Sequence, residues 1–181
     1  MGCEQIIENK HQCVKNSSRR RFLIGSGTAV ALGAIPGVSH ALYANEKKYP
    51  RKKIARLSEL KNDEQVAFRY PFDDLHSTNF LVKLGEVAGG GIGVDNDIVA
   101  FNGLCPHMGG PLSGIYNAEH KVAGPCPLHL TTFDLSRHGM VISGHATESL
   151  PQITLEVDGD DIYATAVIGL IYGHCNHIQE G

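Results

Sequence analysis

Two short segments of the chain place a cysteine close to a histidine, and both residue types bind metals. Cys105 and His107 are separated by Pro106, while Cys126 and His129 are separated by two residues. One thiolate and one imidazole from each segment give four ligands, two of sulfur and two of nitrogen. Such a set fits a structural zinc ion, or an iron–sulfur cluster of two irons in which histidines replace cysteines on one iron.

The spacing favours the cluster over zinc. Zinc fingers usually group their two cysteines in one turn and their two histidines in another. Here each segment supplies one of each, which suits Cys105 and Cys126 on one iron and His107 and His129 on the other. The neighbouring Gly-Pro turns let the backbone come close to a cluster, so that N–H groups can bond its sulfurs.

These segments resemble the two cluster-binding loops of Rieske proteins. The resemblance is carried by CPHMGGPL at residues 105–112 and GPCPLH at 124–129. The segments at residues 133–146 and 169–173, together with the first part of the chain described below, resemble the small subunit of arsenite oxidase. The similarity covers roughly residues 55–173. It implies one Rieske [2Fe–2S] cluster per chain, and a periplasmic subunit that transfers electrons without carrying out the substrate chemistry.

The resemblance also implies partners. A larger, molybdopterin-containing subunit would oxidise arsenite to arsenate, and this chain would relay the electrons to a soluble cytochrome c or a small copper protein. Three alternatives remain open: a Rieske subunit of a quinol:cytochrome c oxidoreductase, a Rieske ferredoxin for an oxygenase, and a zinc-stabilised binding module. The quinol-oxidising proteins have an extra cysteine in each loop, and the ferredoxins usually serve cytoplasmic partners.

The chain departs from the quinol-oxidising Rieske proteins at four positions. Gly110 and Leu128 stand where those proteins have the two cysteines of a disulfide, so we expect none here. Thr131 and Phe133 stand where a serine and a tyrosine bond cluster sulfur. Thr131 can still donate and Phe133 cannot, and a lost hydrogen bond lowers the cluster's potential. We therefore expect a potential below that of the quinol-oxidising members.

The first part of the chain has the pattern of an export signal. SSRRRFLI at residues 17–24 and the apolar stretch at 22–38 precede Ser39-His40-Ala41, which suits a signal peptidase. The arginine pair resembles a twin-arginine signal, so we expect residues 1–41 to direct the chain to the periplasm and to be cleaved. The alternative is a retained membrane anchor, although its glycines and Pro36 make the stretch weakly hydrophobic.

The composition suggests one all-β domain. The 181 residues carry a net charge of −3, without the basic excess of a nucleic-acid binder, and include 21 glycines and 8 prolines. No long helical periodicity is present, and a hairpin turn is expected at 158–161. Short strands are expected at 66–70, 80–84, 98–101, 140–143, 153–157 and 162–166, and residues 54–57 are expected to begin the domain. They predict an antiparallel β sandwich or barrel with a cluster-binding subdomain of two loops.

The remaining boundaries and histidines follow from this assignment. We expect a linker at 42–53, the Rieske domain at 54–173 and a tail at 174–181. His138 and His145 are interpreted as ordinary histidines, although they lie near the second loop in sequence. In the tail, His174 is not expected to bind a metal, and Cys175 is expected to be a free thiol.

Overall fold

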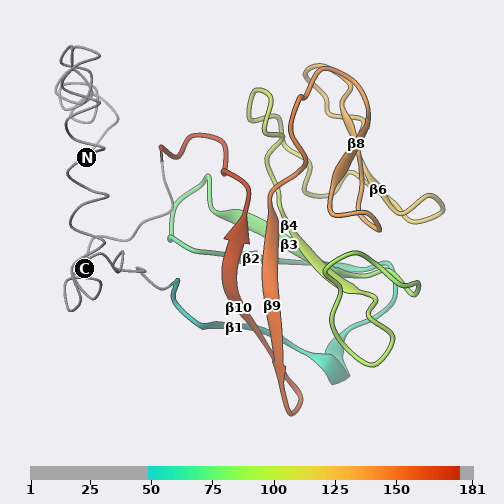
Figure 1. Cartoon of the computed structure of the whole chain (residues 1–181), viewed down its shortest axis with the longest axis vertical. Helices are drawn as coiled ribbons and strands as arrows, with labels where there is room; N and C mark the ends of the chain where they lie inside the picture. Colours follow the sequence, from blue (N-terminus) through green and yellow to red (C-terminus); the bar gives the residue numbers. More distant parts are fainter. Residues whose placement is uncertain (1–48, 176–181) are drawn as a thin grey trace, which may run out of the picture. The chain divides into compact units, whose positions relative to one another are not determined.

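The structure, a computed structural model, describes residues 49–175, which form two antiparallel sheets (Figure 1). The larger sheet has the order β1-β10-β9-β4-β3-β2 and the smaller has the order β5-β6-β7-β8. The larger sheet contains β1 (Lys52–Arg56), β2 (Gln65–Arg69), β3 (Thr78–Lys83), β4 (Ile98–Asn102), β9 (Gln152–Asp158) and β10 (Asp161–Ile168). The smaller contains β5 (Tyr116–Asn117), β6 (Val122–Ala123), β7 (Thr132–Asp134) and β8 (Met140–Ser143).

The smaller sheet is an insertion between two neighbouring strands of the larger one. The chain leaves the larger sheet at the end of β4 and returns to it at the start of β9, and these two strands pair at Ala100–Ile153 and Phe101–Gln152. Both candidate cluster loops lie within this insertion, at one end of the larger sheet (Figure 1). The paired strands therefore fix the two points from which the inserted residues extend.

Alternation along β3 divides the core between two faces. Phe80 and Val82 pack with Phe101 against the insertion, in a cluster that also contains Cys105 and Cys126. The intervening Leu81 packs on the opposite face in a second cluster, with Ala100, Ile153, Leu155 and Ile162. The candidate ligands thus belong to a hydrophobic core, and a change in packing there would reach them directly.

The all-β architecture and all six expected strands are confirmed, each within a few residues. Strand β1 was expected only as the start of the domain, and β5, β6 and β7 were not expected, because two or three residues are too few to show alternation. Part of the expected linker is structured: β1 begins at Lys52, which pairs with Ala164 of β10. Ahead of it, Arg51 lies 3.5 Å from the centre of the Tyr163 ring. The first two residues of this edge strand, Lys52 and Lys53, are polar and exposed, so their pattern resembles that of a linker.

The start of the expected tail is also structured. The side chain of His174 is 8% exposed, and its Nε2 lies 3.1 Å from Asp74 Oδ2. Its ring packs against Phe72, with ring centres 5.0 Å apart. Cys175 is a free, exposed thiol, as expected. The export signal and the rest of the tail lie outside the described residues, and no helix within residues 49–175 is long and apolar enough to cross a membrane.

A set of polar contacts ties the insertion to the larger sheet. The Oδ1 atom of Asp63 accepts hydrogen bonds from the Tyr116 hydroxyl at 2.6 Å and from Lys121 Nζ at 2.7 Å. Close by, Gln65 Oε1 accepts a bond from the backbone N–H of Gly114 at 2.9 Å. The bond from Lys121, followed by that from Tyr116, lowers the pKa of Asp63.

Asp63→Asn should destabilise the protein by about 1 kcal/mol near neutral pH, because it removes the charge of a partly exposed pair. The folded pKa of Asp63 is lowered, so its contribution is present above the unfolded pKa of about 4 and is lost as the pH falls through the folded pKa. Asparagine also tolerates the left-handed φ of 63° at this position.

Urea denaturation of the wild type and of Asp63→Asn over a series of pH values measures the difference in their free energies of unfolding. It should shrink as the pH falls below the ordinary range of an aspartate, whereas Asp95→Asn, at an exposed aspartate, should show little effect at any pH. A difference for Asp63→Asn that stays constant with pH would contradict the assignment.

Candidate metal centre

The first candidate loop is closed by its own backbone. The N–H of Cys105 donates to the carbonyl of Gly110, and the carbonyl of Cys105 accepts from the N–H of Gly109, both at 2.8 Å. Just before the loop, the N–H of Leu104 donates to Asn102 Oδ1 at 3.1 Å. These bonds fix the turn that carries Cys105 and His107.

The second loop repeats this pattern. The N–H of Cys126 donates to the carbonyl of Thr131 at 2.8 Å, and its carbonyl accepts from the N–H of Leu130 at 2.9 Å. In both loops the fourth residue after the cysteine has a left-handed φ, at 71° for Gly109 and 60° for Leu130. The two loops are therefore matched turns, each presenting one cysteine and one histidine.

The matched turns bring the predicted ligands together in pairs. Cys105 and Cys126 are both 1% exposed and have free thiols. Burial raises the pKa of the Cys105 thiol, and the neighbouring Cys126 side chain raises it further. The rings of His107 and His129 have centres 4.6 Å apart, with their planes at 76°.

The residues present fit a cluster of two irons. The Nδ1 atom of His107 is buried without a hydrogen-bond partner, which is unusual for a buried polar atom and suits a metal ligand. No three of the His, Cys, Asp and Glu side chains between residues 49 and 175 are placed to hold a single metal ion. The two cysteines meet as one pair and the two histidines as another, which suits two irons with two protein ligands each.

The structure shows where the four residues lie at which this chain departs from the quinol-oxidising proteins. A Cβ at Gly110 would lie 2.5 Å from Cys126 Sγ and 3.1 Å from Leu128 Cγ, so Gly110 and Leu128 face each other across the loops without a disulfide. Phe133 is fully buried in β7. The Oγ1 atom of Thr131 accepts bonds from the backbone N–H groups of His145 and Ala146, at 3.1 and 3.2 Å. Thr131 therefore also holds a third loop.

The sequence interpretation did not anticipate that His145 lies beside the two candidate histidine ligands. Its ring centre lies 6.0 Å from that of His107 and 6.1 Å from that of His129. Sixteen positions separate it from His129, and the only local clue is the preceding Gly144, whose φ is 102°. His138, in contrast, has a structural role, because its Nδ1 lies 2.9 Å from Gln152 Oε1.

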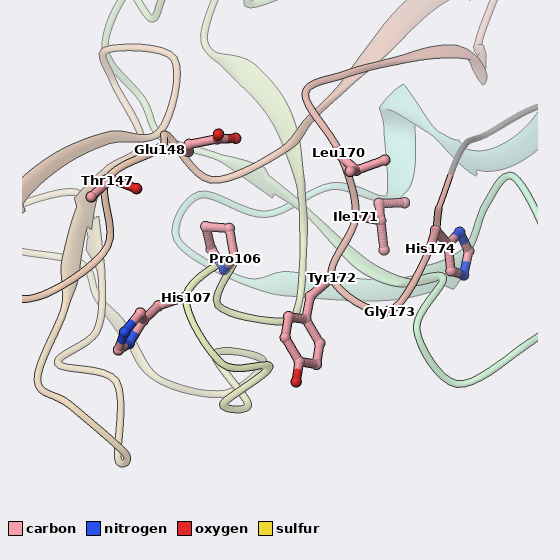
Figure 2. A pocket seen from close by; sticks show the side chains of 9 residues that line it. All are labelled: Pro106, His107, Thr147, Glu148, Leu170, Ile171, Tyr172, Gly173 and His174. Atoms are coloured by element: carbon pink, nitrogen blue, oxygen red, sulfur yellow. The ribbon is translucent and has the colours of Figure 1, made fainter. Parts of the chain in front are cut away.

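A pocket of about 320 Å³ lies beside the first loop (Figure 2). Figure 2 shows Pro106 and His107 on one side of it and the segment from Leu170 to His174 on the other. A Cβ at Gly109 would collide with the Tyr172 ring, so this segment packs directly against the loop. The C-terminal part of the described chain thus supports the turn that carries His107.

Comparisons with known proteins agree with this geometry. The family model of the Rieske [2Fe-2S] domain matches residues 51–154. The chain is 63% identical over 159 residues to the iodate reductase subunit IdrB of Pseudomonas sp. (strain SCT), covering 86% of this chain and 82% of that protein. It is 60% identical over 161 residues to the IdrB subunit of Denitromonas iodatirespirans, covering 88% and 86%.

More distant proteins share less of the chain. The cytochrome bc1 complex Rieske iron-sulfur subunit of Streptomyces lividans is 39% identical over 70 residues, covering 39% of each protein. In structure, the soluble domain of Rieske protein II (soxF) from Sulfolobus acidocaldarius matches with a TM-score of 0.57 and 26% identity, covering 66% of this chain and 78% of that one. Together, the family match and the similarity to the soxF structure confirm the predicted fold and [2Fe–2S] cofactor.

Gly110→Ala should lower the bound iron, because the added methyl would lie 2.5 Å from Cys126 Sγ and 3.1 Å from Leu128 Cγ, whereas the quinol-oxidising proteins have a second cysteine in place of Leu128. Gly114→Ala is the matched control: it also introduces strain, at a φ of 80°, but a Cβ there meets no atom within 4 Å. Iron content per folded chain measures both. Full iron content in folded Gly110→Ala would contradict the tight packing of Gly110 against Cys126 and Leu128.

Phe133→Tyr should raise the reduction potential by about 40 mV, if the hydroxyl adds one hydrogen bond of about 1 kcal/mol to the reduced cluster. A redox titration followed by EPR measures the shift, and Phe68→Tyr in β2 of the larger sheet provides a control. An unchanged or lower potential in Phe133→Tyr would show that this position does not reach the cluster.

Proposed function

The chain belongs to the Rieske [2Fe-2S] domain family, and we propose that it is the electron-transfer subunit of an iodate reductase. The observation that carries this proposal is the identity of 63% and 60% with two iodate reductase IdrB subunits, over more than four fifths of each chain. The bc1-type subunit matches only 39% of the chain, which makes a quinol-oxidising role the weaker candidate.

The residues of this chain serve to hold and expose the cofactor. When bound, the cluster accepts and releases one electron at a time. Cys105 and Cys126 are buried in the core, whereas His129 is exposed and His107 is half-buried. Electrons would therefore leave on the histidine side, where a partner can approach the imidazole edges. The substrate chemistry belongs to that partner.

We propose a larger, molybdopterin-containing subunit as this partner. Iodate reduction consumes electrons, so they would flow from a soluble cytochrome c or small copper protein through this chain to the larger subunit. The twin-arginine pattern at residues 17–24 supports a periplasmic location for the complex. The structure does not describe that segment.

Arsenite oxidation is the second candidate, and it is favoured by the similarity of residues 133–146 and 169–173 to the arsenite oxidase small subunit. Arsenite oxidation would use the same cluster but reverse the direction of electron transfer, because oxidation of arsenite to arsenate releases electrons. The direction in which substrate changes the redox state of the cluster therefore separates the two candidates.

The test uses the complex of this chain with its larger subunit. After stoichiometric reduction with dithionite, addition of iodate should remove the EPR signal of the reduced cluster, whereas nitrate should leave it. A Cys126→Ser complex, which lacks a proposed ligand, should show no such signal. If arsenite instead reduces the oxidised cluster and iodate does not reoxidise it, the iodate proposal fails and arsenite oxidation replaces it.

A further inference from the structure

His145 lies directly beside both candidate histidine ligands. Its ring is stacked at 20° on that of His107 and lies nearly perpendicular, at 73°, to that of His129. Within residues 49–175, these are the only side-chain interactions found for His145, and the residue is exposed. Its imidazole therefore extends the exposed surface formed by the two ligand rings.

The backbone of His145 is held by the second cluster loop. Thr131 Oγ1 accepts the N–H groups of both His145 and Ala146, and Thr131 lies two residues after His129. A side chain at Gly144 would collide with the backbone of Thr131, so only glycine allows this close approach. The position of His145 is thus tied to that of the ligands.

Three large apolar side chains next to these histidines in sequence are exposed. Met108, Leu128 and Leu130, which adjoin the two histidine ligands in sequence, are 53%, 52% and 66% exposed. Leu130 also has a left-handed φ of 60°, which costs energy for a residue other than glycine. Neither the exposure nor the strain stabilises the isolated chain. Permanent subunit interfaces are more apolar than transient ones, which favours a stably bound partner over a diffusing one.

We propose that His145 is a third imidazole of the electron exit, through which the cluster passes its electron to the larger subunit. One electron leaves the reduced cluster and enters a redox centre of that subunit, while His145 is neither oxidised nor reduced. Its ring shortens the gap that the electron must cross and contacts the partner. This inference rests on the proposed electron-transfer function, and extends it to a residue that binds no iron.

The test measures the two electron transfers separately in the complex with the larger subunit. The variants are His145→Ala, His145→Gln and His145→Phe, with His120→Ala as the control at another exposed histidine. Rapid mixing follows reoxidation of the reduced cluster by iodate and, in a second experiment without iodate, reduction of the cluster by ferrocytochrome c. The reduction potential and EPR spectrum of each variant are recorded as well.

Loss of one well-packed interface side chain should slow reoxidation about tenfold in His145→Ala. His145→Gln should be equally slow, and His145→Phe, which keeps a ring, should retain more of the rate. The potential, the EPR spectrum and the reduction by ferrocytochrome c should match the wild type, as should every measurement on His120→Ala.

Three outcomes would overturn the proposal. These are an unchanged reoxidation rate in His145→Ala, slowing confined to the ferrocytochrome c step, and a changed potential or EPR spectrum, which would mean that His145 acts on the cluster itself. The wild-type complex tests the substrate independently. If it responds to arsenite and not to iodate, the same variants are compared with arsenite as the electron source.

Discussion

The convergence of two turns on one buried site is the constraint on which the rest of the structure depends. Each turn is closed by a pair of backbone hydrogen bonds to its cysteine, and the two cysteines meet in the core. Their burial leaves little room, so a glycine stands at position 110, against Cys126 Sγ. With Leu128 opposite it in this chain, a bulkier residue at position 110 would push the two loops apart.

The larger sheet supplies the rigid base for these turns. Asn102, the last residue of β4, is fully buried, and its Nδ2 donates to the carbonyls of His76 and Thr78 and to Asn79 Oδ1. Its Oδ1 holds the N–H of Leu104, next to the first ligand. A single side chain thus joins the strand, the 76–79 segment and the first loop. Such a satisfied buried network fixes geometry more firmly than apolar packing alone.

The sequence predicted those features that depend on residue type or on regular alternation. The ligand pairs, six of the seven longer strands and the absence of cysteines at positions 110 and 128 were all visible in the order of residues. The matched closure of the two loops was not, because it is made by backbone atoms. The position of His145 beside the ligands was missed for a related reason: Thr131 and Gly144 bring it there only in three dimensions.

Polar edges were the other source of error. The exposed side chains of Lys52 and Lys53 resemble those of a linker, although their backbones pair with β10. At the opposite end, His174 follows a short glycine-containing segment, yet it packs in a half-buried group with Phe72 and His76. Both segments are ordered by partners about a hundred residues away in sequence or more, which no local pattern reveals.

The account's central claim is that two cysteines bind one iron and two histidines bind the other. Electron–nuclear hyperfine spectroscopy on the reduced complex, with its histidines labelled with the nitrogen-15 isotope, tests this claim most directly. The account predicts strong coupling to two histidine nitrogens, one of which disappears in His107→Ser or His129→Ser if that variant retains a cluster. A cluster signal without coupling to histidine nitrogen would contradict it.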